Sequence, residues 1–295
     1  MNNIAVIGSG TMGNGIAHVF AQSGFKVQMI DIDQNALDKG IKSIEKNLDR
    51  QIKKEKITES EKENTLSNIS TSTDLASASK SIDLAVEAVS EDINIKTKIF
   101  QQLDENAPAE AILASNTSSI SITKLAAVTN RNDQVIGMHF MNPVPVMKLV
   151  EIIRGYATSD KVTKSITEIS EKLGKVPVEA HDYPGFVANR ILMPMINEAI
   201  YTKWQGIAGV QEIDTVMKLG MAHPMGPLQL ADFIGLDVCH SILEVLHDGF
   251  GDGKYAPCPL LTNMVTAGKL GTKSGEGFYD YIEDAKNPKV SAQFT

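Results

Sequence analysis

The feature that most constrains the fold lies in residues 3–33, where a short apolar run is followed by a glycine-rich turn, a helical stretch and a second apolar run. Residues 3–7 predict a buried parallel strand, because a short continuous apolar run here stops at a glycine. Residues 25–32 predict a second strand. Strand, turn, helix and strand within about thirty residues are typical of a dinucleotide-binding unit.

The glycines of the turn stand in the G-x-G-x-x-G spacing, and each has a separate role in such a unit. Gly8 lets the chain leave the strand sharply, Gly10 leaves room for a pyrophosphate, and Gly13 lets the helix pack closely on the sheet. The helix, expected to begin at about Thr11, points its unpaired amides at the phosphates. The predicted contacts to NAD are Gly8, Gly10, Thr11, Met12 and Gly13.

Asp31 is the residue expected to select the cofactor. A carboxylate at the end of the second strand accepts hydrogen bonds from the ribose hydroxyls of NAD and repels the extra phosphate of NADP. Asp33 is the alternative ribose ligand, or it is simply a turn residue.

The composition is that of an ordinary globular protein of 295 residues, with 42% hydrophobic and 22% charged residues. This length favours two domains over one. A net charge of -8 argues against general nucleic-acid binding, and the two cysteines are expected to be reduced thiols, with no metal site. We see no membrane-spanning stretch and no secretory leader, so the expected location is the cytoplasm.

Residues 35–68 predict a helical hairpin that stands on the nucleotide domain, because apolar residues recur at helical spacing among many charged ones. Four cations gather near its tip: Arg50, Lys53, Lys54 and Lys56. They form either a solvated helical face or a site for a phosphate-bearing ligand.

Further strands are predicted at residues 82–89, 111–114, 135–140 and 176–180, with helices at 93–106, 123–128 and 161–173. Glu87 or Glu91 lies at a strand end, where ligands bind in a doubly wound sheet. In the polar loop after residue 114, Ser119 or Ser121 is expected to cap the next helix. Asn116 to Ser118 are left open between a structural and a ligand-binding role.

His139, near the end of a predicted strand, is either a structural residue or, if a partner carboxylate holds it, a candidate general base. Its candidate partner is Glu151, which lies in the apolar run 148–153 and needs a partner if it is buried. Pro143 and Pro145 tighten the connection, so we expect the second run to turn back beside the first. An imidazole held by a carboxylate has the tautomer that a base for an alcohol needs.

The chain changes character at residues 183–185, a predicted boundary between domains 1–183 and 184–295. Beyond it the periodicity is helical, with helices expected at 186–204, 210–219, 228–246 and 261–267. We therefore predict an α/β, Rossmann-type doubly wound, mostly parallel sheet with a protruding helical hairpin, followed by an all-α C-terminal domain. The C-terminal domain is expected to bind substrate and form a homodimer.

Several stretches resemble the L-3-hydroxyacyl-CoA dehydrogenase family, and within it the short bacterial 3-hydroxybutyryl-CoA dehydrogenases. These stretches are ASNTSSISI, GMHFMNPVPVMKLVEIIRG, PGFVANRILMPMINEA, AHPMGPLQLADFIGLD and KSGEGFYDY. The resemblance implies NAD-dependent interconversion of an (S)-3-hydroxyacyl-CoA and its 3-oxoacyl-CoA, in fatty-acid or butanoate metabolism. Alternatives are a dehydrogenase of a free 3-hydroxy acid and a non-catalytic cofactor-binding protein.

The resemblance also implies roles for single residues. His139 corresponds to the family's catalytic base and Glu151 to the glutamate that orients it. Ser118 matches a serine that contacts substrate and cofactor, and Asn189 matches the asparagine that holds the 3-oxygen. Further matches are to cofactor contacts, at Glu91, Lys96, Asn142 and Lys273, and to a lysine on the CoA phosphates, at Lys54.

Overall fold

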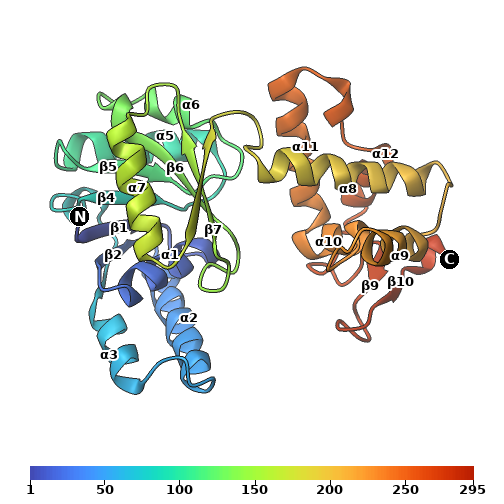
Figure 1. Ribbon diagram of the computed structural model, residues 1–295, viewed down its shortest axis with the longest axis horizontal. Coiled ribbons are helices and arrows are strands. Elements are labelled where there is room, and N and C mark those ends of the chain that lie inside the picture. The colour runs from blue at the N-terminus through green and yellow to red at the C-terminus, as the bar shows by residue number, and fades with distance from the viewer. The chain divides into compact units, whose positions relative to one another are not determined.

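The computed structural model describes residues 1–295, and the chain divides into two compact units, Met1–Tyr183 and Pro184–Thr295 (Figure 1). Each unit has a hydrophobic core of its own. No helix is both long enough and apolar enough to cross a membrane.

The first unit is built on an eight-stranded sheet with the order β3-β2-β1-β4-β5-β6-β7-β8. All neighbouring strands pair in parallel except β6 and β7, which are antiparallel. The order reverses between β1 and β4, the switch point where doubly wound sheets bind ligands. The strands are β1 (Asn3–Ile7), β2 (Lys26–Ile30), β3 (Ile69–Ser72), β4 (Leu84–Glu87), β5 (Ile112–Ser115), β6 (Val135–Phe140), β7 (Leu149–Arg154) and β8 (Val176–His181).

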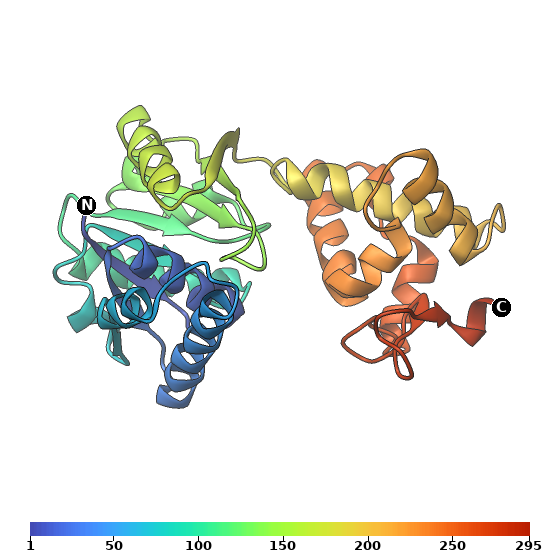
Figure 2. The same ribbon diagram turned by 60° about the horizontal axis from the view of Figure 1, so that its bottom comes forward.

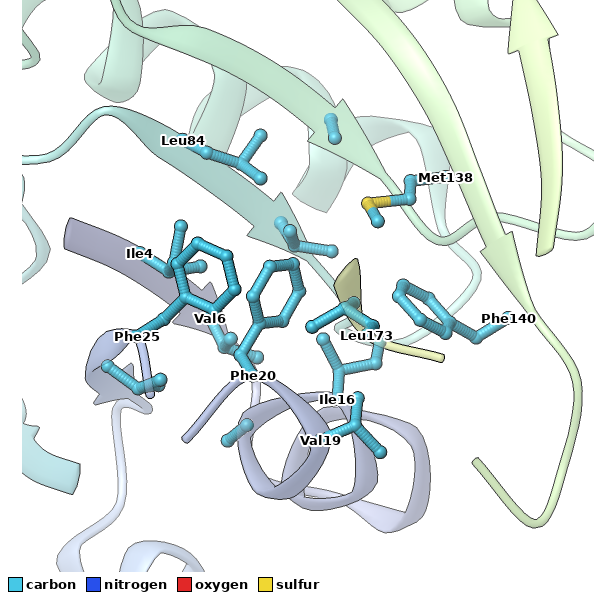
Figure 3. Packing of buried hydrophobic residues seen from close by; sticks show 14 of the residues in the cluster. Ile4, Val6, Ile16, Val19, Phe20, Phe25, Leu84, Met138, Phe140 and Leu173 are labelled. Carbon is cyan, nitrogen blue, oxygen red and sulfur yellow. The ribbon is translucent and has the colours of Figure 1, made fainter. Parts of the chain in front are cut away.

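Helices cover both faces of this sheet. The first face packs against α1 (Thr11–Gln22), α2 (Gln34–Ile52) and α7 (Asp160–Lys172), which share one apolar cluster with the strands. Figure 3 shows the centre of this cluster, where Phe20 of α1 lies between Phe25 and residues of the central strands. The helices α5 (Ile93–Asn106) and α6 (Ile122–Ala126) lie behind the sheet in the view of Figure 1.

The predicted hairpin consists of α2 and α3 (Glu59–Ser67), which extend beyond the sheet (Figures 1 and 2). Asp33 caps the first helix, since its side chain accepts a hydrogen bond from the amide of Asn35. Thr58 and Glu61 form a capping box at the start of the second. The helices are thus specified locally at both starts.

The structure corrects two expectations about secondary structure. Strand β3, with the sequence ISTS, was not expected because it is short and polar, as suits an exposed edge strand. A single helix was expected at residues 228–246, but two are present, α10 (Pro227–Ile234) and α11 (Leu236–Phe250). Gly235 separates them, and its φ of 105° is incompatible with a continuous helix.

The second unit is helical, with a small antiparallel ribbon near the C-terminus. Its remaining elements are α8 (Ala188–Trp204), α9 (Val210–Gly220), α12 (Pro259–Thr266), β9 (Tyr279–Asp280) and β10 (Lys289–Val290). A short helix, α4 (Leu75–Ala78), completes the first unit. The predicted fold class is confirmed, with the ribbon as an addition to the helical unit.

Candidate active site

The turn between β1 and α1 contains two kinds of glycine, those that the packing of the protein requires and one that it does not. A Cβ on Gly13 would lie 1.8 Å from the carbonyl oxygen of Gly8, and one on Gly8, whose φ is 98°, would lie 2.6 Å from that of Ala88. Both glycines are therefore required by the packing of the turn itself. A Cβ on Gly10 would meet no protein atom within 4 Å, so the fold does not explain that glycine.

The space around Gly10 suits a dinucleotide. Gly10 is exposed at the N-terminus of α1, where no side chain caps the free amides. A cavity of about 420 Å³ adjoins it and is lined by Gly8, Gly10, Asp31 and apolar residues of the neighbouring strands and α5. Free amides and a missing side chain are what a pyrophosphate needs.

Asp31, at the end of β2, is oriented by the same turn. Its Oδ2 accepts hydrogen bonds from the amide and the hydroxyl of Ser9, both at 2.8 Å. Its Oδ1 accepts the amide of Asp33 at 3.3 Å. Asp33 caps α2, so of the two aspartates only Asp31 lines the cavity.

The polar residues of the central strands gather on one face of the sheet because side chains alternate along a strand. Leu84, Val86, Met138, Phe140 and Ile152 point into the core shared with α1 and α7. The intervening positions therefore face α5 and α6. They include Glu87, Ser115, His139 and Glu151.

His139 and Glu151 are direct partners across the antiparallel pair of β6 and β7. His139 Nδ1 lies 2.8 Å from Glu151 Oε2, and both residues are buried. A carboxylate can only accept, so Nδ1 carries the proton and Nε2 is left as the acceptor of the neutral ring. The expected approach of Glu151 to His139 is confirmed.

Ser118 completes this group from the loop after β5. Its Oγ lies 3.0 Å from His139 Nε2, the nitrogen turned away from Glu151. Hydroxyl, imidazole and carboxylate thus lie in one row. A row of this kind can take a proton at Nε2 and stabilise the charged ring through Nδ1.

The loop that holds Ser118 is bound to a glutamate. Glu91 Oε1 accepts the amides of Ser118 and Ser119, each at 3.1 Å, together with the hydroxyls of Thr117 and Ser119. Ser121 caps α6, which leaves Ser119 as a loop residue. Lys96 is buried, and its ammonium lies 3.2 Å from Glu91 Oε2.

The remaining predicted site residues lie in two loops of the first unit and in the second unit. Asn142 is exposed just after β6, and Lys54 is exposed in the turn after α2. In the second unit, Asn189 belongs to the first turn of α8, and Lys273 forms a two-oxygen ion pair with Asp237 at 2.8 Å.

Lys175 is a buried lysine that the sequence analysis did not single out. Its ammonium donates to the carbonyl oxygens of Val144 and Met147, at 2.5 and 2.8 Å, and so closes the loop that contains Asn142. Burial lowers the pKa of this lysine. In the sequence, only its position directly before the predicted strand at residues 176–180 could have indicated that this lysine is buried.

Both units match known protein families. Residues 3–183 match the 3-hydroxyacyl-CoA dehydrogenase NAD binding domain, and residues 185–281 match the 3-hydroxyacyl-CoA dehydrogenase C-terminal domain. The chain is thereby matched from β1 into the C-terminal ribbon.

Individual relatives agree with these family matches. A probable 3-hydroxybutyryl-CoA dehydrogenase from Bacillus subtilis is 56% identical, over 96% of this chain and 98% of the relative. The human mitochondrial hydroxyacyl-coenzyme A dehydrogenase is 45% identical, over 95% and 91%. The crystal structure of an (S)-3-hydroxybutyryl-CoA dehydrogenase from Ralstonia eutropha has a TM-score of 0.93 at 50% identity, covering 96% of this chain and 100% of that one. The chain therefore belongs to the 3-hydroxyacyl-CoA dehydrogenase family and is an NAD-dependent oxidoreductase.

Proposed function

We propose that the protein interconverts (S)-3-hydroxybutyryl-CoA and acetoacetyl-CoA, with His139 as the general acid and base. The observation that carries this proposal is the row of Ser118, His139 and Glu151, with His139 Nδ1 held 2.8 Å from the carboxylate. The short acyl chain is taken from the names of the two bacterial relatives described above, a probable 3-hydroxybutyryl-CoA dehydrogenase and an (S)-3-hydroxybutyryl-CoA dehydrogenase.

In the oxidative direction, His139 Nε2 takes the proton of the substrate's 3-hydroxyl group. Glu151 stabilises the imidazolium that forms, because the carboxylate faces the protonated Nδ1. Ser118 donates a hydrogen bond to the 3-oxygen, and we assign the same role to Asn189. A bound NAD would supply the acceptor for the hydride that leaves carbon 3. In the reverse direction the imidazolium returns the proton to the oxygen.

The cofactor would be held by the glycine turn and the residues around it. The uncapped α1 N-terminus and the open space at Gly10 support phosphate binding there. The carboxylate of Asp31, which lines the same cavity, supports binding of the ribose hydroxyls. We assign cofactor contacts to Gly8, Gly10, Thr11, Met12, Gly13, Asp31, Glu91, Lys96, Ser118 and Asn142. Lys273 is a further candidate, whose side chain is 46% exposed beside its ion-pair partner Asp237.

The hairpin is the proposed site for the CoA phosphates. Arg50, Lys53, Lys54 and Lys56 are exposed around the end of α2, in a chain whose net charge is -8. Clustered cations in an acidic protein concentrate anions locally. A free hydroxy acid has no phosphate groups for these cations to bind. We assign the phosphate contact to Lys54.

A homodimer formed through the second unit is also part of the proposal. Leu219, Ile207 and Phe233 are large apolar residues that are 82%, 70% and 67% exposed in the single chain. Exposed apolar surface of this kind is typical of a contact between protein chains. Sedimentation equilibrium should give twice the mass of the chain, and a monomer at micromolar concentration would contradict the dimer. The cytoplasmic location stays a prediction.

The test of the function is a comparison of substrates and cofactors with one enzyme preparation. Acetoacetyl-CoA and NADH should be consumed together, whereas free acetoacetate should not react and NADPH should react much more slowly. Turnover of free acetoacetate alone would identify a hydroxy-acid dehydrogenase instead. Binding of NADH without turnover of either substrate would identify a non-catalytic protein.

A further inference from the structure

Lys175 is a buried lysine that has no carboxylate partner. It lies between α7 and β8, and both hydrogen bonds of its ammonium go to backbone carbonyl oxygens, those of Val144 and Met147. Burial lowers its pKa, whereas an adjacent carboxylate would raise it. A buried ammonium without a counterion is costly, and such costs are expected at functional sites. The segment that the ammonium binds therefore indicates its role.

That segment is the loop of residues 141–148, which joins β6 to β7. The amides of Val146 and Met147 donate to the carbonyl oxygen of Pro143, at 2.9 and 3.0 Å, so the loop forms a tight turn. Lys175 binds two further carbonyl oxygens of the same turn, at 2.5 and 2.8 Å. The ammonium thus supplies the donors for carbonyl oxygens that lie within the turn.

The same loop packs against α1, the helix that begins at the dinucleotide turn. Val144 is buried, and a Cβ on Gly15 of α1 would lie only 2.9 Å from the Cβ of Val144. Helix and loop approach this closely because position 15 has no side chain. One turn further along α1, burial and the charge of Lys175 lower the pKa of His18 to about 4, so the ammonium lies near this contact. Lys175 therefore holds the loop where it meets α1.

Asn142 is exposed in this loop, three residues after His139. The proton and the hydride go to adjacent atoms of the substrate, the 3-oxygen and carbon 3, so the nicotinamide ring of a bound cofactor must lie close to His139 Nε2. Asn142 is therefore expected to meet the nicotinamide end of the cofactor. The pairing of His139 with Glu151 is set by the register of β6 and β7 and does not need the loop.

We propose that Lys175 is a positioning residue, which holds the loop 141–148 on α1 and thereby places Asn142 against the nicotinamide end of the cofactor. This inference rests on the proposed function and on the cofactor contact assigned to Asn142. Without the ammonium, two carbonyl oxygens would lose their donor, and the loop would have to open to let water reach them. Asn142 would then lose its fixed position, while the strand pair that carries the base would remain.

ADP-ribose, which lacks the nicotinamide ring, separates this role from a general loss of structure. The test variant is Lys175→Met, which keeps the apolar stem and removes the ammonium. Lys172→Met, an exposed change at the end of α7, is the matched control. By titration calorimetry, Lys175→Met should raise the Kd for NADH about fivefold, the loss of one ordinary hydrogen bond. The Kd for ADP-ribose should stay within about twofold of wild type, since the adenine end is distant from the loop. The control should match wild type for both ligands.

The rate of hydride transfer is the second measurement. In a single turnover of NADH-loaded enzyme with acetoacetyl-CoA, Lys175→Met should be about 100-fold slower than wild type, the cost of misplacing a reacting group by about 1 Å. Asn142→Ala should raise the NADH Kd by a similar factor. The double variant should lose no more affinity than the worse single variant, because both changes remove the same contact. Lys175→Ala leaves room for water at the two carbonyl oxygens, and so provides the test if Lys175→Met fails to fold.

Wild-type NADH affinity and rate in folded Lys175→Met or Lys175→Ala would overturn the inference. So would equal losses of affinity for NADH and ADP-ribose, which would show that Lys175 only supports the fold of the first unit. The two titrations need no turnover. If the variants lose affinity for NADH alone, but the wild type does not reduce acetoacetyl-CoA, the proposed function fails and the positioning role of Lys175 stands.

Discussion

The tautomer of the His139 ring decides which nitrogen can act as the base. Glu151 Oε2, 2.8 Å from Nδ1, keeps the proton there, so Nε2 is the basic atom beside Ser118. The pairing follows from the register of β6 and β7, in which His139 lies directly opposite Glu151. Loss of the carboxylate alone should therefore disturb the chemistry while leaving the strands intact.

Glu151→Gln tests this tautomer directly. The amide can donate to Nδ1, which would place the ring proton on Nε2 and block the base. We expect kcat to fall by about 100-fold or more, as for the corresponding change in other carboxylate-oriented histidines. The pH dependence of kcat is the second measurement. Glu168→Gln, an exposed change on α7, is the control, and equal kcat values in the two variants would contradict this role.

At the scale of secondary-structure elements, the turn between β1 and α1 contains one glycine that folding requires, Gly13, and one that we expect binding to require, Gly10. Gly13→Ala would place a Cβ 1.8 Å from the oxygen of Gly8 and should lower the free energy of unfolding by about 3 kcal/mol or more. Gly10→Ala meets no protein atom and should leave the melting temperature nearly unchanged. It should instead weaken NADH binding, measured by fluorescence titration. Unchanged NADH affinity would show that no phosphate approaches Gly10.

The hairpin of α2 and α3 has its own prediction. Lys54→Glu should raise the KM for acetoacetyl-CoA about tenfold, because a hydrogen bond to a charged group contributes about 1.5–3 kcal/mol. The KM for NADH should not change. Lys39→Glu, an exposed change earlier in α2, controls for net charge. Equal effects of the two variants on the thioester KM would leave the hairpin without a specific phosphate contact.

Most elements of the first unit could be predicted because local patterns specify them. Apolar runs that stop at glycine or polar loops mark β1, β4, β5 and β6, and α5 lies at the residues expected, Ile93–Asn106. Strand β3 was not predicted because its sequence is polar, and its stability comes from pairing with β2. The break between α10 and α11 at Gly235 was not predicted because the helical spacing of apolar residues continues across it.

The parts of the candidate site that follow from the path of the backbone could be predicted from the sequence. The contacts made by the ends of long side chains could not. The prolines after β6 indicated that Glu151 returns to His139. Spacing along the sequence does not tell where an ammonium at the end of four methylene groups will lie. The ion pairs of Lys96 with Glu87, and of Lys273 with Asp237, became visible only with the fold.

At the scale of the whole molecule, the stability of the second unit should depend on pH through Asp232. Burial raises the pKa of Asp232 to about 7, against hydrogen bonds from the amides of Phe278 and Tyr279 and the hydroxyl of Tyr281. A raised carboxyl pKa means that the folded state holds the proton more tightly than the unfolded chain. Its contribution is complete below about pH 4 and is lost as the pH rises through about 7.

Asp232→Asn should flatten the dependence of the melting temperature on pH between about 4 and 7, because the amide does not titrate. The absolute stability can change in either direction, so the slope is the quantity to compare. Differential scanning calorimetry of both proteins across this range is the measurement. Parallel curves for wild type and variant would show that Asp232 keeps an ordinary pKa.

The most direct test of the central claim is a single-turnover reaction of NADH-loaded enzyme with acetoacetyl-CoA, run on wild type and on His139→Gln. The account predicts rapid loss of NADH absorbance in the wild type and a rate at least about 100-fold lower in the variant, the usual contribution of general acid and base catalysis. The two proteins should bind NADH with nearly equal affinity. A His139→Gln enzyme that consumes NADH at the wild-type rate would contradict the assignment of His139 as the acid and base.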